Sequence, residues 1–160
     1  MRLLQTTTRE MDRHDVIADV RQVQSEMGVA MIAFTVYGTP RPQGSTRAFI
    51  PKGWKRAVIT TDNTKLKPWR QEVSGAAMAL NPEVLCGAIV LCVDFFFKRP
   101  RSAPKARTMP TVKPDVDKLL RGILDACTGI CYNDDAQVVQ VFASKHYGDP
   151  ERCEIKLREL

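Results

Sequence analysis

Carboxylates are concentrated in one segment of a chain that is otherwise basic. Five of the 18 acidic side chains of this 160-residue protein lie between residues 113 and 138, as Asp115, Asp117, Asp125, Asp134 and Asp135. Like charges at short range raise each other's pKa and destabilise the folded state. A hard divalent cation ligated by carboxylate oxygens removes that penalty. The D-x-D spacing of Asp115 and Asp117, with the adjacent pair Asp134 and Asp135, therefore predicts a metal site.

The first two aspartates stand at the beginning of a helix predicted for residues 115–127. Apolar residues occupy one side of this helix, and Asp117, Arg121 and Asp125 form a polar ridge at i, i+4 and i+8. A metal ion beside this ridge would activate water for phosphodiester hydrolysis. Either Arg121 or Lys118 would stabilise the negative charge that develops.

The second pair, Asp134 and Asp135, is expected to begin the strand that follows the helix. If that strand runs beside the beginning of the helix, four carboxylates face one small volume. Each aspartate also has a purely structural explanation. An aspartate at a helix start is a common N-cap, Asp117 and Arg121 form an ordinary i, i+4 pair, and "YNDDA" has a usual turn composition.

Basic residues give the chain a net charge of +6, and they gather in two loop-like segments. Residues 38–70 contain eight Lys or Arg against one acid, and residues 98–113 contain six and no acid. Solvated loops would have this composition, but two such clusters around an acidic centre favour a polyanion such as DNA. The predicted DNA contacts are Arg41, Arg47, Lys52, Lys55, Arg56, Lys98, Arg99, Arg101, Lys105, Arg107 and Lys113.

The order of predicted elements indicates a single α/β (α+β) domain with a mixed sheet packed by two main helices. Strands are expected at 30–38, 57–61, 88–97, 136–148 and 152–160. Helices are expected at 68–80 and 115–127, with a long loop or loose hairpin at 39–56 and a proline-rich loop at 98–114. Residues 1–30 are predicted to be a polar extension, helical or disordered, and residues 31–160 the domain.

Composition also excludes some classes of protein. No apolar run reaches the roughly 18 residues that a membrane span needs, and the N-terminal residues lack the apolar stretch of a secretory signal. The five cysteines are expected to be reduced thiols in the core of a cytoplasmic protein. A zinc site from Cys127, Cys131, Cys153 and His146 is the alternative, without a C-x-x-C pair to support it.

The segment "PDVDKLLRGILDACTGICYNDDAQV", residues 114–138, resembles the signature of the RusA-like Holliday junction resolvases. These endodeoxyribonucleases are common in phages and prophages. The resemblance extends loosely over residues 31–157, through "GTPRPQGSTR" and the closing strands. It implies a compact α/β fold and a homodimer with paired active sites that cuts branched, four-way DNA junctions with Mg²⁺ or Mn²⁺.

The resemblance also implies roles for individual residues. Asp115 and Asp117 match the two metal-binding aspartates of the family, and Asp135 matches the third essential carboxylate, with Asp134 beside it. Arg121 stands where the family usually has a catalytic lysine. A guanidinium scarcely gives up a proton, so Arg121 departs from a general-acid role, which Lys118 could fill instead.

Three other functions remain open from the sequence. The first is a nuclease of the same chemistry that acts on flapped or otherwise branched DNA. The second is a non-catalytic DNA-binding module in which the aspartates are only caps and turns. The third is an RNA-binding protein with Trp54 and Trp69 as stacking platforms, although such tryptophans more often anchor loops to the core. His14 and His146 have no assigned role.

Overall fold

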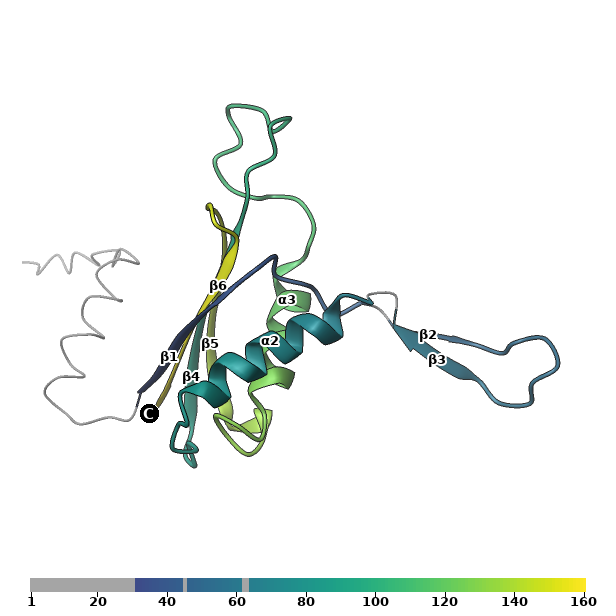
Figure 1. The fold of residues 1–160 in the computed structure, drawn as a ribbon, viewed down its shortest axis with the longest axis horizontal. Helices are drawn as coiled ribbons and strands as arrows, with labels where there is room; N and C mark the ends of the chain where they lie inside the picture. Colours follow the sequence, from purple (N-terminus) through teal and green to yellow (C-terminus); the bar gives the residue numbers. More distant parts are fainter. Residues whose placement is uncertain (1–30, 45, 62–63) are drawn as a thin grey trace, which may run out of the picture. The chain divides into compact units, whose positions relative to one another are not determined.

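The computed structural model describes residues 31–44, 46–61 and 64–160, with the side chains of residues 46–49 and 58–61 excepted. The predicted N-terminal extension, residues 1–30, therefore lies outside the described residues. The remainder forms an α+β fold with a mixed sheet and two helices, as the order of elements predicts (Figure 1).

The main sheet has four strands in the order β1-β6-β4-β5. These strands are β1 (Met31–Tyr37), β4 (Ile89–Phe97), β5 (Val138–Tyr147) and β6 (Arg152–Glu159). β6 runs antiparallel to both β1 and β4, whereas β4 and β5 are parallel. A parallel pair needs a crossover connection, and the helix α3 (Val116–Cys127) supplies it.

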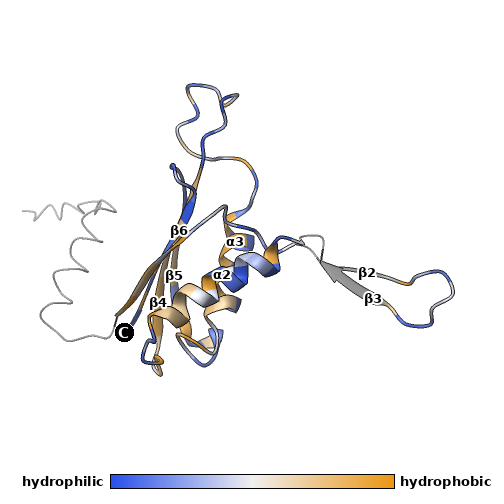
Figure 2. Ribbon diagram, in the orientation of Figure 1, coloured by the Kyte–Doolittle hydropathy of each residue, from blue (hydrophilic) through white to orange (hydrophobic). Residues whose placement is uncertain are grey.

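Both helices, α2 (Leu66–Ala79) and α3, lie on one side of this sheet (Figure 1). Alternation along β4 explains why, because Ile89, Leu91, Val93 and Phe95 point to that side and are at most 1% exposed. Figure 2 shows hydrophobic residues concentrated in the sheet and the helices, whereas the loop between β4 and α3 is largely hydrophilic. Burial of this apolar face stabilises the domain.

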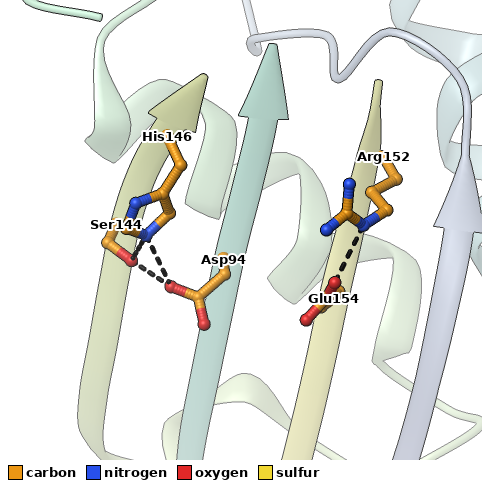
Figure 3. Close-up of polar contacts among 5 residues, drawn as sticks. All are labelled: Asp94, Ser144, His146, Arg152 and Glu154. Carbon is orange, nitrogen blue, oxygen red and sulfur yellow. Dashed lines mark hydrogen bonds and ion pairs between the residues drawn. The ribbon is translucent and has the colours of Figure 1, made fainter. Parts of the chain in front are cut away.

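The other side of the sheet carries polar side chains (Figure 3). The Ser144 hydroxyl donates a hydrogen bond to Asp94, and His146 Nε2 lies 2.8 Å from Ser144 Oγ and 3.2 Å from Asp94 Oδ1. On β6, Arg152 Nε donates to Glu154 Oε1 at 2.8 Å. His146 thus has partners that the sequence did not indicate.

Close approach of α3 to its neighbours explains Gly122. A Cβ at this position would lie 3.5 Å from Leu66 Cδ1 and 3.6 Å from the Arg41 carbonyl oxygen. Gly122 is buried because α2 and the segment after β1 pack there. The Gln43 amide also donates to the Lys118 carbonyl oxygen at 2.8 Å, which attaches this segment to α3.

The loop predicted at 39–56 contains the first strand of a hairpin. β2 (Thr46–Phe49) and β3 (Val58–Thr61) pair antiparallel in a two-stranded sheet, and neither pairs with a strand of the main sheet. Their connection turns at residues 51–54, where the Trp54 amide donates to the Pro51 carbonyl oxygen at 2.9 Å. Gly53 has φ +90°, a conformation that glycine adopts without strain.

Other element boundaries shift by small amounts. α2 begins at Leu66 rather than Pro68, and β5 begins at Val138 because residues 135–137 form the short 3₁₀ helix η1. All five cysteines are free, with Cys127, Cys131 and Cys153 buried, Cys92 half-buried and Cys86 exposed. Among the described residues, no helix has the length and apolar character required to cross a membrane.

Candidate functional site

Two carboxylates stand at the beginning of α3 without serving as caps. Asp115 occupies the N-cap position with extended backbone angles (φ −73°, ψ 142°), but its side chain accepts no hydrogen bond from the helix backbone. Asp117 lies exposed in the first turn. Negative charge is favourable at a helix N-terminus because of the helix dipole. The carboxylate oxygens of both aspartates are thus open to interactions other than capping.

Lys118 is the cationic neighbour of this pair. Its Nζ lies 3.3 Å from Asp115 Oδ2, and both side chains are roughly half exposed. Such a partly solvated ion pair is weak. It can therefore open when a stronger ligand for the carboxylate arrives.

Lys145, near the end of β5, fixes the segment that leads into α3. Its Nζ donates to the carbonyl oxygens of Val112 at 2.9 Å and Pro114 at 2.8 Å. Pro114 directly precedes Asp115, so the ammonium group sets the position from which the aspartates extend. Sequence reasoning missed Lys145, since a single lysine within a strand carries no motif.

An open hollow of about 550 Å³ adjoins Asp115. It lies between the end of the 98–114 loop, the start of α3 and the strand β5. Its lining combines the acidic Asp115 with basic, apolar and hydroxyl side chains: Met109, Pro110, Thr111, Val112, Lys113, Val116, Ala143, Ser144 and Lys145. A solvent-open hollow with these charges has room for a hydrated cation or a phosphate group.

The residues of the polar ridge predicted along α3 have different environments. Asp125 pairs with Arg70 of α2, with Arg70 Nη1 3.2 Å from Asp125 Oδ2. Asp125 thereby attaches α2 to α3 and is not part of the site. Arg121 is exposed one turn after Asp117, and within the described part of the chain it forms no ion pair.

The second aspartate pair divides into a structural and an uncommitted residue. Asp134 caps η1, because its Oδ1 accepts a hydrogen bond from the Ala136 amide at 2.8 Å. Gln137 completes a capping box, since its Oε1 accepts from the amides of Asn133 and Asp134. Gln137 Nε2 also donates to the carbonyl oxygens of Leu85 and Gly87, which attaches the turn to the segment before β4.

Asp135 is exposed like Asp134 but, in the described residues, its carboxylate accepts no hydrogen bond. Its carboxylate is therefore available to a ligand. The D-D-x-Q spacing is typical of a helix cap as well as of a functional site. The sequence alone could not show which aspartate has which role.

The condition under which four carboxylates would face one volume is not met within one chain. Lys145 contacts the beginning of α3 from the end of β5, whereas Asp135 precedes the beginning of β5. The two aspartate pairs thus lie toward opposite ends of α3, a helix of 12 residues that is roughly 18 Å long at 1.5 Å per residue. In the described ranges, no group of three or more His, Cys, Asp or Glu side chains could hold a metal ion. This finding also leaves the alternative zinc site without support.

Two carboxylates nevertheless fit one class of metal ion. Mg²⁺ keeps several waters and is commonly bound by one or two carboxylates together with substrate phosphates. Asp115 and Asp117 provide that number of oxygen ligands from a single helix start. The donor set of one chain is therefore compatible with Mg²⁺, and more so when a phosphate is present.

The predicted DNA contacts fall into two groups. Arg47 lies in β2 and Lys52, Lys55 and Arg56 are exposed at the hairpin tip, while Arg41 belongs to the segment packed on α3. In the other loop, Lys98 pairs with Asp149 at 3.0 Å, and Arg99 donates to the Pro104 carbonyl oxygen at 2.8 Å. Arg101, Lys105 and Lys113 of that loop are exposed and Arg107 is partly buried.

The chain is similar in sequence to one family of nucleases and to one bacterial protein. The family model of endodeoxyribonuclease RusA matches residues 35–158. The uncharacterized protein YqaN of Bacillus subtilis (strain 168) is 36% identical over 140 residues, which cover 81% of this chain and 96% of that protein. The family match includes the aspartates at the two ends of α3.

Proposed function

The chain belongs to the endodeoxyribonuclease RusA family, and we propose that it is a divalent-metal-dependent endonuclease that resolves four-way DNA junctions. The observation that carries this proposal is the pair Asp115 and Asp117, which stands at the α3 start without capping it. A non-catalytic module with aspartates used only as caps would have the opposite arrangement there.

Asp115 and Asp117 would hold Mg²⁺ or Mn²⁺ in this proposal. When bound, the ion would polarise a phosphate oxygen and supply a nucleophilic water at neutral pH. Lys118 exchanges its ion pair with Asp115 for a phosphate contact when the substrate arrives. Arg121 stabilises charge on the phosphate as a permanent cation and does not act as a proton donor.

The active form in this proposal is a homodimer. Asp135 is too far from Asp115 and Asp117 to share their ion within one chain, so a second copy brings its own Asp135 to the site. The edge strand β5 supports such an arrangement, because Val139, Val141 and Phe142 expose apolar surface along it. An exposed apolar strand edge is a ready surface for association. Two sites in one dimer would cut two strands of a junction.

The decisive experiment is cleavage of a labelled four-way junction, with and without a chelator. We expect paired cuts that require Mg²⁺ or Mn²⁺, and loss of cleavage with retained junction binding in Asp117→Asn. Asp125→Asn is the matched control on the same helix, since Asp125 is bound to Arg70. Normal cleavage by Asp117→Asn would remove this carboxylate from the chemistry.

The same assay separates the alternative substrates. Fork, flap and linear duplex DNA of the same sequence are compared with the junction at equal protein concentration. A faster rate on flaps would assign the chemistry to flap removal. Equal rates on linear duplex would exclude the resolvase function, and binding without any cleavage would leave only a DNA-binding module.

A further inference from the structure

The two tryptophans of the chain have opposite environments. Trp69, in α2, is 3% exposed and belongs to the hydrophobic core. Trp54, at the tip of the β2–β3 hairpin, is 63% exposed. The expected packing on the core is therefore found for Trp69, which lies in a helix and not in a loop, and is wrong for Trp54. An exposed indole adds little apolar burial to the fold, and its ring stays open to contact with a ligand.

The turn itself holds Trp54 outward. Residues 51–54 close with the hydrogen bond from the Trp54 amide to Pro51, and Gly53 permits the turn through its positive φ. A Cβ at Gly53 would have no atom within 4 Å, so the tip is open on that side. The hairpin has two strands, and an isolated hairpin has no core of its own into which an indole could be buried.

The charges around Trp54 are all of one sign. Lys52, Lys55 and Arg56 are exposed beside it, and residues 50–57 contain no acid. A shallow hollow of about 410 Å³ is lined by Gly53, Trp54, Lys55 and Arg56. Surfaces that bind unpaired nucleotides usually combine an exposed aromatic ring with neighbouring cations. They do not need hydrogen-bond acceptors for the base edges. The ring stacks on a base while the cations contact phosphates.

We propose that Trp54 stacks on an unpaired base at the branch point of the DNA, with Lys52, Lys55 and Arg56 on the adjacent phosphates. This inference rests on the proposed function for its choice of DNA over RNA. In an intact duplex the base faces are covered by their neighbours, so an indole gains no stacking there. At a branch point or in a single strand a base face is open. The hairpin tip therefore distinguishes branched from continuous DNA, which phosphate contacts alone do not do.

Tryptophan fluorescence tests the inference directly, because Trp69 is buried and serves as an internal reference. The full-length protein is titrated in chelator with a four-way junction, a continuous duplex and a single strand of the same sequence. We expect the junction and the single strand, but not the duplex at equal occupancy, to quench Trp54 emission and to protect it from acrylamide. Trp54→Phe should lose the quenching and leave the Trp69 signal unchanged.

Affinities separate stacking from charge. Trp54→Ala should weaken junction binding by about tenfold, while Trp54→Phe, which keeps an aromatic face, stays within about threefold of the original protein. The salt dependence of binding should be unchanged in Trp54→Ala, because no phosphate contact is lost. It should become shallower in Lys52→Ala/Lys55→Ala by about one unit of slope for each contact removed.

Equal quenching by the duplex, or unchanged junction affinity in Trp54→Ala, would overturn the inference. Tighter binding and stronger quenching by single-stranded RNA than by DNA would also overturn it and assign the tip to RNA. These outcomes are independent of cleavage, which is absent in chelator. Cleavage of junctions without Trp54 quenching would support the proposed function and contradict this inference. Quenching without cleavage in Mg²⁺ would support this inference and contradict the proposed function.

Discussion

The Lys145 ammonium group lies 2.8 Å from the carbonyl oxygen of Pro114, the residue that directly precedes Asp115. With its second bond to Val112, Lys145 connects the end of β5 to the start of α3. The ammonium group thus holds two backbone carbonyl oxygens in place. Through them it fixes the backbone from which Asp115 extends. Lys145 acts as a positioning residue, because its donors are directed to the backbone.

Replacement of Lys145 by Met should therefore change metal use more than DNA binding. We expect the Mg²⁺ concentration for half-maximal cleavage to rise by about 10- to 100-fold, the range found when groups that orient metal ligands are removed. Junction affinity in chelator should stay within about threefold. Lys67→Met, on the exposed side of α2, is the matched control. An unchanged metal titration in Lys145→Met would reduce this lysine to a packing role.

Replacement of Asp134 and of Asp135 should affect different properties of the protein, namely stability and cleavage. Asp134→Ala removes a cap and is expected to lower the free energy of unfolding by about 1 kcal/mol, measured by urea denaturation. Asp135→Ala should leave stability within about 0.5 kcal/mol, as for a surface substitution, and abolish cleavage. If Asp134→Ala loses cleavage at full stability, the assignment of the two residues must be exchanged.

Asp125 is predicted to contribute to helix packing and not to catalysis. Its ion pair with Arg70 is partly solvated, so Asp125→Ala should cost no more than about 1 kcal/mol of stability. Cleavage of the junction should proceed at the original rate. Arg70→Ala should have the same small effect, and the double variant should cost less than the sum of both. Additive effects would mean that the pair contributes nothing in solution.

Arg121 is expected to accelerate cleavage as a fixed positive charge. Arg121→Ala should lower the cleavage rate by about 10²- to 10³-fold, as for other groups that stabilise transition-state charge, with little change in junction affinity. Arg121→Lys should retain most of the rate at neutral pH, since both side chains are cationic there. If the original protein and Arg121→Lys have the same pH–rate profile around neutral pH, the side chain acts through its charge and not as a proton donor. A rate in Arg121→Ala equal to the original would transfer the role to Lys118.

The buried thiols predict how stability depends on pH. Burial raises the pKa of Cys153 above the ordinary thiol value of 9.0, with Asp94 and Glu154 acting in the same direction. Above pH 9 the unfolded chain loses this proton while the folded chain keeps it, so stability is fully present below pH 9 and falls as pH rises. Each such thiol contributes a slope of about 1.4 kcal/mol per pH unit.

Urea denaturation between pH 8 and 10 under reducing conditions measures this slope. Cys153→Ala should make the alkaline loss of stability shallower by about the slope of one thiol, and the remaining loss includes Cys127, whose pKa the Cys131 thiol and burial also raise. Cys86→Ala is the control, because Cys86 is exposed. A loss in Cys153→Ala as steep as in the original protein would show that this thiol is not what titrates.

The strands and helices were predictable because each has a strong local pattern. β4 alternates between buried and partly buried residues from Leu91 to Phe96, and α3 has an apolar side that ends at Cys127, so both boundaries match closely. β2 was not predicted as a separate strand, since "TRAF" is short and follows a segment rich in Pro and Gly. Its partner β3 gives it structure, and pairing across a turn is not visible in local composition.

The candidate site was predictable in its residue types but not in its geometry. The sequence indicates that Asp115, Asp117 and Asp135 differ from ordinary surface aspartates. It does not indicate that β5 runs parallel to β4, which moves Asp135 to the far end of α3. The roles of Lys145 and Gln137 depend on carbonyl oxygens distant in the chain, and a side chain that binds backbone leaves no partner residue to recognise in a sequence.

The pairing of β1 with β6 joins the first described strand of the chain to the last, with Met31 opposite Arg158. β6 also separates β1 from β4, so the sheet is continuous only when residues 152–159 are in place. Because synthesis proceeds from the N-terminus, β1 and β4 are made before the strand that separates them in the sheet. A product that lacks residues 152–159 would therefore leave β1 without its partner strand, and this sheet would not assemble.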